Sequence, residues 1–184
     1  MSQNQKEALA AYLVANQEKF YRLAFSYVRS QEAALDIVQN AVVKGLEHAE
    51  SIREMAYIKT WFYRILVNES LSYMKKYGRE VPLEPEQMRE IPDGSKEEWQ
   101  EESEMYQAVM GLPEEMKTVV VLRFYEDMTL AEIAEVTGIS LSQVKYRLYT
   151  NWKNCGSNVM GRWQHEGKRF GGTAAGYQKD LRAD

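Results

Sequence analysis

The chain has 184 residues and a formal net charge of −4, from 23 Lys and Arg against 27 Asp and Glu. Its single cysteine excludes an intramolecular disulfide and a multi-cysteine zinc site, and its two histidines leave little for metal chemistry. No stretch approaches ~18 uninterrupted apolar residues, and the N-terminus lacks a basic segment followed by an apolar run. We expect a cytoplasmic protein with no direct membrane insertion and no cofactor.

Charge is distributed in three blocks along the chain. Residues 1–80 hold 11 basic and 9 acidic side chains, residues 81–116 hold 2 and 11, and residues 117–184 hold 10 and 7. Two slightly basic blocks therefore flank a strongly acidic connector. The acidic total does not exclude binding of a polyanion by either end.

In residues 1–80, apolar residues recur at spacings of three and four, without sustained alternation at period two. The pattern predicts helices near residues 3–29, 31–49 and 54–77, with Ser30 as the N-cap of the second. The stripes comprise Phe20, Leu23, Ala24, Tyr27 and Val28; Ala34, Ile37, Val38, Ala41, Val42 and Leu46; and Trp61, Phe62, Ile65, Leu66, Leu71 and Met74. We predict an all-α helical bundle over residues 1–80.

Residues 81–103 carry Pro82, Pro85, Pro92, an Asp93-Gly94 pair and many glutamates. Proline removes backbone donors and like charges repel one another, so this stretch is predicted to be a flexible acidic linker. It separates the bundle from a second small helical domain over residues 104–154.

In that second domain, Leu112 and Pro113 are predicted to begin a helix that stops at residues 125–127. Two capping boxes follow, at residues 129–132 and 140–143, where a Ser or Thr and a Glu or Gln satisfy each other's backbone donors. Between them, Gly138 suits a turn with positive φ. This spacing indicates a DNA-binding helix-turn-helix, although some helical hairpins of this shape serve only packing or dimerisation.

The second helix of that motif presents polar side chains in its first turns. Gln can pair with adenine, Arg with guanine, and Lys and Ser with phosphates. The candidate DNA contacts are Ser142, Gln143, Lys145, Tyr146 and Arg147. The alternative is an ordinary solvated helix face.

Residues 155–184 contain six glycines and no helical stripe. Glycine at this density disfavours a packed element, so a disordered tail is predicted.

The order of these segments resembles the extracytoplasmic-function group of bacterial RNA polymerase sigma factors over about residues 8–152. Residues 36–42 look like the polymerase-binding helix, and residues 61–68 with 71–76 look like the segment that opens and reads the −10 promoter element. Residues 112–114, followed by 119–125 and the helix-turn-helix, look like the domain that reads the −35 element.

The resemblance implies that core RNA polymerase, promoter DNA and an anti-sigma factor are the partners. It implies that residues 48–53 form a loop that accepts a flipped base, and that the polymerase-binding helix meets a basic partner. The polymerase-binding residues would be Asp36, Gln39, Asn40 and Lys44, and the −10 contacts Tyr63, Arg64, Asn68, Ser72, Tyr73, Lys75 and Lys76. Aromatic rings that stack on single-stranded bases and cations that hold phosphates suit this role.

Other interpretations remain open from the sequence. Trp61, Phe62 and Ile65 are expected to include core members, since a Trp in a small bundle is more often buried than stacked on a base. A free-standing helix-turn-helix regulator or a helical adaptor would share parts of the pattern. An enzyme is not expected, because no phosphate loop, zinc motif or nucleophile elbow occurs and a Cys155–His165 pair lacks a third member.

Overall fold

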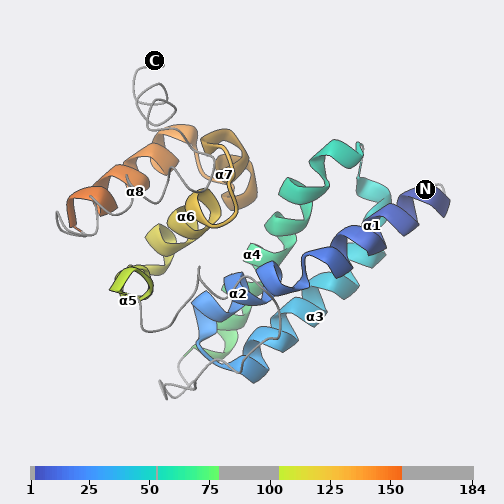
Figure 1. Cartoon of the computed structure of the whole chain (residues 1–184), viewed down its shortest axis with the longest axis horizontal. Coiled ribbons are helices and arrows are strands. Elements are labelled where there is room, and N and C mark those ends of the chain that lie inside the picture. Colours follow the sequence, from blue (N-terminus) through green and yellow to red (C-terminus); the bar gives the residue numbers. More distant parts are fainter. Residues whose placement is uncertain (1–2, 53, 79–103, 155–184) are drawn as a thin grey trace. The chain divides into compact units, whose positions relative to one another are not determined.

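The computed structural model describes residues 3–52, 54–78 and 104–154, and all regular structure within them is helical. These residues form two helical regions, one before and one after the acidic segment (Figure 1). The prediction of an all-α chain with two helical regions is confirmed. The linker prediction for residues 81–103 and the tail prediction for residues 155–184 both concern segments that lie outside the described residues.

The first region consists of four α-helices and two short 3₁₀ turns. These are α1 (Gln3–Ala15), α2 (Gln17–Val28), α3 (Gln31–Glu47), the turns Ala49–Ser51 and Met55–Tyr57, and α4 (Ile58–Tyr77). The second region, which begins after residue 103, contributes four more helices. These are α5 (Glu104–Met110), α6 (Glu114–Phe124), α7 (Leu130–Thr137) and α8 (Leu141–Asn154).

Helices α2, α3 and α4 pack against one another (Figure 1). Aromatic side chains of α2 and α4 meet in their core. Phe20 and Phe62 are both 0% exposed, and their ring centroids lie 4.5 Å apart. Gly45 allows α3 to approach α4 closely, because a Cβ at this position would lie 3.1 Å from a ring carbon of Phe62. This core fixes the outer faces of α3 and α4.

The predicted helix over residues 3–29 is divided at Asn16, which is a correction. The side-chain amide of Asn16 donates a hydrogen bond to the carbonyl oxygen of Tyr12 at 2.8 Å and so caps the end of α1. Asn competes with the helix backbone in this way because its short polar side chain reaches nearby backbone groups. The chain then restarts as α2 at Gln17.

The next two predicted helices are present with shorter bounds. Ser30 is the N-cap of α3, as predicted, and its hydroxyl accepts from the amide of Ala33 at 3.3 Å. Helix α3 ends at Glu47, and α4 begins at Ile58 instead of residue 54, because 3₁₀ turns occupy part of the connection.

In the second region, α6 packs against α5 and α8. Helix α6 begins after Pro113 and ends before Tyr125, as the sequence predicts. Both predicted capping boxes are formed: the Glu132 amide donates to the Thr129 hydroxyl at 3.2 Å, and the Thr129 amide donates to the Glu132 carboxylate at 2.7 Å. The corresponding distances in the Ser140–Gln143 box are 3.2 and 3.1 Å.

Gly138, between α7 and α8, has φ of 71°, and a Cβ built there would meet nothing within 4 Å. A substitution at Gly138 would therefore strain the backbone without a steric clash between side chains. We expect Gly138→Ala to lower the free energy of unfolding by about 1–2 kcal/mol, and Gly138→Asn to cost less, because Asn tolerates the left-handed region. Urea unfolding measures both, and equal midpoints for the two variants and the unmodified chain would contradict the assignment.

Candidate functional site

The predicted polymerase-binding residues lie on the outer face of α3. Asp36, Gln39 and Asn40 are exposed, while Ile37 and Ala41 face the core. The helical period thus separates a polar outer face from the buried stripe.

Lys44, the fourth predicted contact, is held by α4. Its ammonium lies 2.5 Å from a carboxylate oxygen of Glu69, whose side chain is 15% exposed. The positive charge of Lys44 is therefore partly neutralised by a neighbouring helix.

Three apolar side chains interrupt the polar face of α3. Leu35, Val43 and Leu46 are 43, 53 and 52% exposed. The sequence pattern assigned Leu46 to the buried stripe, which is wrong, and it did not single out Leu35 or Val43. Val43 follows Leu35 by eight residues, and Leu46 follows Val43 by three. This spacing is the sequence signal that could have identified an exposed apolar stripe on α3. Such side chains suit a protein partner more than solvent.

On α4, the structure separates the predicted −10 contacts. Tyr63 is 1% exposed and packs edge-on against Phe20 at 5.5 Å, so it is a core residue and the predicted DNA contact is corrected. A Tyr ring has enough apolar area to serve as a core residue. The remaining candidates are exposed or half-buried; they are Arg64, Asn68, Ser72, Tyr73, Lys75 and Lys76.

The C-terminal end of α4 carries an aromatic pair. The rings of Tyr73 and Tyr77 lie 4.7 Å apart, and the Lys76 ammonium lies 4.9 Å from the centre of the Tyr77 ring. Burial raises the pKa of Tyr73 above its ordinary 10, and the charges of Asp36, Tyr77 and Glu32 add to this. A phenol is already neutral near pH 7 at its ordinary pKa, and the upward direction of this shift keeps the Tyr73 hydroxyl a hydrogen-bond donor. Tyr77 was missed in the sequence, although its spacing of four from Tyr73 indicates a shared face.

Trp61 is half-buried and ties α4 to the preceding connection. Its indole N–H donates to the hydroxyl of Ser51 at 3.0 Å. Phe62, in contrast, is fully buried, and Ile65 is half-buried. The expectation that Trp61, Phe62 and Ile65 include a core residue is therefore confirmed by Phe62. Arg53, at the end of the loop predicted to accept a base, lies outside the described residues.

On α8, Val144 and Leu148 are buried at 0 and 7% exposure, and the predicted DNA contacts lie on the other sides of the helix. Ser142, Gln143 and Tyr146 are exposed, whereas Lys145 and Arg147 are half-buried. Leu141, which was not predicted, is 43% exposed on the same helix and is of the apolar type that contacts thymine methyl groups.

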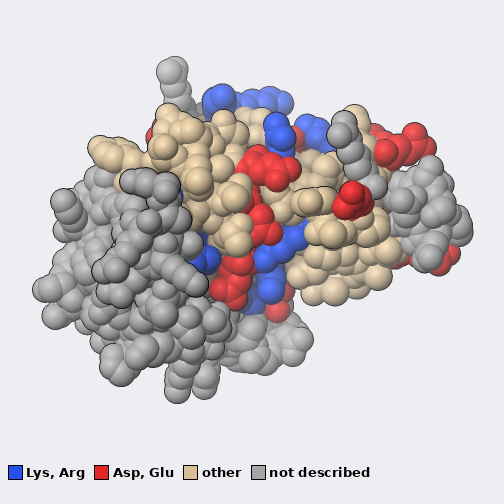
Figure 2. Space-filling view, turned by 90° about the horizontal axis from the view of Figure 1, so that it is seen from above, with Lys and Arg blue, Asp and Glu red and all other residues tan. Residues whose placement is uncertain are grey.

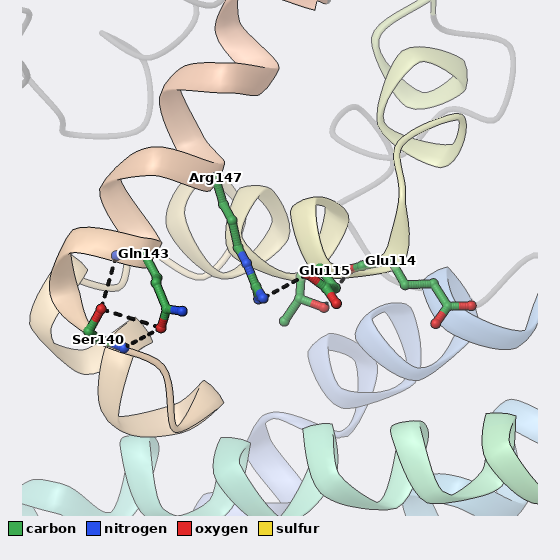
Figure 3. A network of polar contacts seen from close by, with 6 residues as sticks. Glu114, Glu115, Ser140, Gln143 and Arg147 are labelled. Carbon is green, nitrogen blue, oxygen red and sulfur yellow. Dashed lines mark hydrogen bonds and ion pairs between the residues drawn. The ribbon is translucent and has the colours of Figure 1, made fainter.

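Two of these polar side chains already have partners in the second region (Figure 3). The Gln143 carbonyl oxygen accepts from the Ser140 amide at 3.1 Å within the capping box. The Arg147 guanidinium lies 2.7 Å from a Glu115 carboxylate oxygen. If Gln143 recognises adenine, its side-chain carbonyl oxygen would therefore have to accept from the base while it also accepts from the Ser140 amide.

Ser140→Ala should lower the stability of α8 by about 1 kcal/mol, because the Gln143 amide loses its acceptor. Hydrogen exchange of the first α8 amides measures the loss. Ser142→Ala, two residues on in the same exposed turn, is the matched control and is expected to leave exchange almost unchanged. Equal protection in the two variants would contradict a capping role for Ser140.

On the face drawn in Figure 2, Lys and Arg of the described residues lie next to Asp and Glu. The described part of the chain contains no group of three or more His, Cys, Asp or Glu that could hold a metal ion. None of its helices is long and apolar enough to span a bilayer.

Comparison with known proteins identifies two matching families in one chain. Residues 13–80 match the family described as Sigma-70 region 2, and residues 102–149 match Sigma-70 region 4. The chain is 40% identical to RNA polymerase sigma factor SigV of Bacillus subtilis, over 80% of this chain and 88% of that protein. It is 28% identical to the ECF RNA polymerase sigma-E factor of Haemophilus influenzae, over 81% of this chain and 86% of that protein.

Two solved structures share the fold. The sigma factor RpoE of Bartonella quintana, in complex with the anti-sigma factor NepR, has a TM-score of 0.68 and 22% identity, over 87% of this chain and 98% of that one. CnrH, in complex with the cytosolic domain of CnrY, has a TM-score of 0.55 and 16% identity, over 80% of this chain and 84% of that one. These likenesses concern the fold.

Proposed function

Because this chain belongs to the sigma-70-like, extracytoplasmic-function family of RNA polymerase sigma factors, we propose how its two helical regions divide the work of a promoter-specific transcription initiation factor. Helices α1–α4 bind core RNA polymerase and the −10 element, and helices α5–α8 bind the −35 element. The observation that carries this is the presence of region 2 and region 4 segments, in that order, in one chain. A free-standing helix-turn-helix regulator is not favoured, because it would leave the region 2 segment without a role.

The polymerase contact is assigned to the outer face of α3. Exposed polar groups at Asp36, Gln39 and Asn40 supply orientation, and the exposed apolar groups Leu35 and Leu46 supply buried area. Interfaces gain most of their affinity from a few such anchors surrounded by polar contacts. Lys44 is the least favoured of the four predicted contacts, because it already pairs with Glu69.

The −10 strand is assigned to the exposed side of α4. Arg64, Asn68 and Ser72 follow one another at intervals of four and so share one face. The Tyr73–Tyr77 pair next to them offers rings for bases, and the adjoining Lys75 and Lys76 offer charge for phosphates. Stacking of one base on an aromatic ring contributes ~1–3 kcal/mol, so a few contacts can offset unpairing of an AT-rich step.

The −35 element is assigned to α8. Exposure of Ser142, Gln143 and Tyr146, with Val144 buried behind them, supports insertion of this helix into the major groove. Arg147 is the candidate for a guanine edge, and Lys145 for a phosphate.

Run-off transcription with core RNA polymerase, the full-length chain and a library of genomic fragments tests the function. We expect transcripts whose start sites share an upstream motif, and no transcription from polymerase alone. Charge reversal at Arg147 or Lys145 should weaken recognition of the upstream part of that motif. Binding to duplex DNA with full specificity in the absence of polymerase would contradict the proposal and favour the free-standing regulator.

An anti-sigma factor is the proposed regulatory partner, since the fold resembles that of a sigma factor solved with one. Such a partner is expected to cover α3 and compete with core RNA polymerase for this chain in gel filtration. Binding without displacement of polymerase would contradict this.

The site of action is the cytoplasm, where core polymerase and promoters occur, and a fluorescent fusion should overlap the nucleoid.

A further inference from the structure

Arg147 is tied to α6 in the absence of DNA. Its Nη2 atom lies 2.7 Å from Oε2 of Glu115 (Figure 3). Glu115 belongs to the first turn of α6, Arg147 to the second turn of α8, and these two helices pack against each other. The contact therefore joins the candidate DNA-reading helix to its supporting helix through side chains.

The exposure of the pair indicates that its role is not in folding. The Glu115 side chain is 73% exposed and the Arg147 side chain 22% exposed. An ion pair with so exposed a partner contributes little to stability, because water and salt screen it. It does restrict the rotamers of a long side chain, and an ordered Arg loses less conformational entropy when it binds.

The contact leaves donors available for DNA. Arg has five N–H donors and no acceptor, and the contact with Glu115 engages Nη2. Recognition of guanine needs two donors, which the rest of the guanidinium can supply. A carboxylate beside Arg147 also repels phosphates, so it favours a base edge over the backbone as the partner of Arg147.

We propose that Glu115 is a specificity-determining residue that positions Arg147 for a base edge in the upstream promoter element. The inference rests on the proposed DNA-reading role of α8. In the sequence, Glu115 belongs to the acidic block of residues 81–116, where nothing marks it out from the other glutamates.

Glu114 provides a matched control. It precedes Glu115 in the same helical turn, is also exposed, and carries the same charge. Its side chain points away from Arg147 (Figure 3). Glu114→Gln therefore removes one negative charge from the same helix terminus as Glu115→Gln, without removing the ion pair.

The experiment uses the full-length chain with core RNA polymerase. The strongest promoter recovered from the genomic fragments is remade with each of the four bases at every upstream position, and run-off transcripts give the best-to-worst base ratio at each. Arg147→Ala should lower this ratio about tenfold at one position. Glu115→Gln should lower it about threefold at that same position, because the guanidinium is present but less ordered. Glu114→Gln should leave it unchanged.

Three results would overturn the inference. If Arg147→Ala loses discrimination while Glu115→Gln matches Glu114→Gln, Glu115 does not position the guanidinium. If Glu115→Gln weakens every position equally, its role is structural. If Arg147→Ala changes no position, α8 does not read DNA through Arg147, and the inference fails with that assignment. Failure of the unmodified chain to direct any transcript overturns the proposed function itself.

Discussion

Phe62→Ala is expected to lower the free energy of unfolding of the α1–α4 region by about 3–5 kcal/mol. The ring is 0% exposed, lies 4.5 Å from that of Phe20, and fills the space beside Gly45. Its removal loses the transfer free energy of the ring and leaves a cavity that α3 and α4 can close only in part. Urea unfolding followed by hydrogen exchange of peptides from α2–α4 measures the loss separately from α5–α8.

Tyr57→Ala is the control, since this aromatic side chain is 58% exposed just before α4. It should change the free energy of unfolding by no more than about 0.5 kcal/mol. A double-mutant cycle with Gly45→Leu sharpens the test. Gly45→Leu alone should destabilise by about 1–3 kcal/mol through overpacking against Phe62, and by less when Phe62 is already Ala. Additive losses would show that the two sites do not share the same space.

The features that were predicted correctly depend on residues close together in the chain. The Ser30 cap, the capping boxes begun by Thr129 and Ser140, and the positive φ of Gly138 each follow from a few neighbouring side chains and the backbone they satisfy. Local hydrogen bonding of this kind is readable from spacing alone.

The features that were missed depend on the packing of distant segments. Tyr63 was predicted to contact DNA, but its position opposite Phe20 of α2 places it in the core. Leu46 fits the periodic stripe of α3 in sequence, yet α2 and α4 cover a narrower face than the stripe and leave it 52% exposed. Glu115 and Arg147 are 32 positions apart in the sequence, so no local pattern indicates that they form an ion pair.

Helix α3 should hold core polymerase through its exposed apolar groups as well as through its polar ones. Leu46→Lys is expected to reduce the affinity of the chain for core RNA polymerase at least about 30-fold, the loss typical of an interface anchor worth 2 kcal/mol or more. The replacement removes apolar contact area and adds a positive charge. The basic partner that the family resemblance implies would repel the positive charge of the new lysine. Fluorescence anisotropy of labelled full-length chain titrated with core polymerase measures the change.

Val14→Lys is a closely matched control for this prediction. Val14 is 67% exposed and is the penultimate residue of α1, as Leu46 is of α3. A lysine in the last turn interacts favourably with the helix dipole at both sites, so neither variant is expected to lose stability. Val14→Lys should leave polymerase affinity within about twofold of the unmodified chain, because a single exposed charge away from an interface contributes little. Equal losses in the two variants would indicate a general charge effect and would remove the apolar stripe of α3 from the interface.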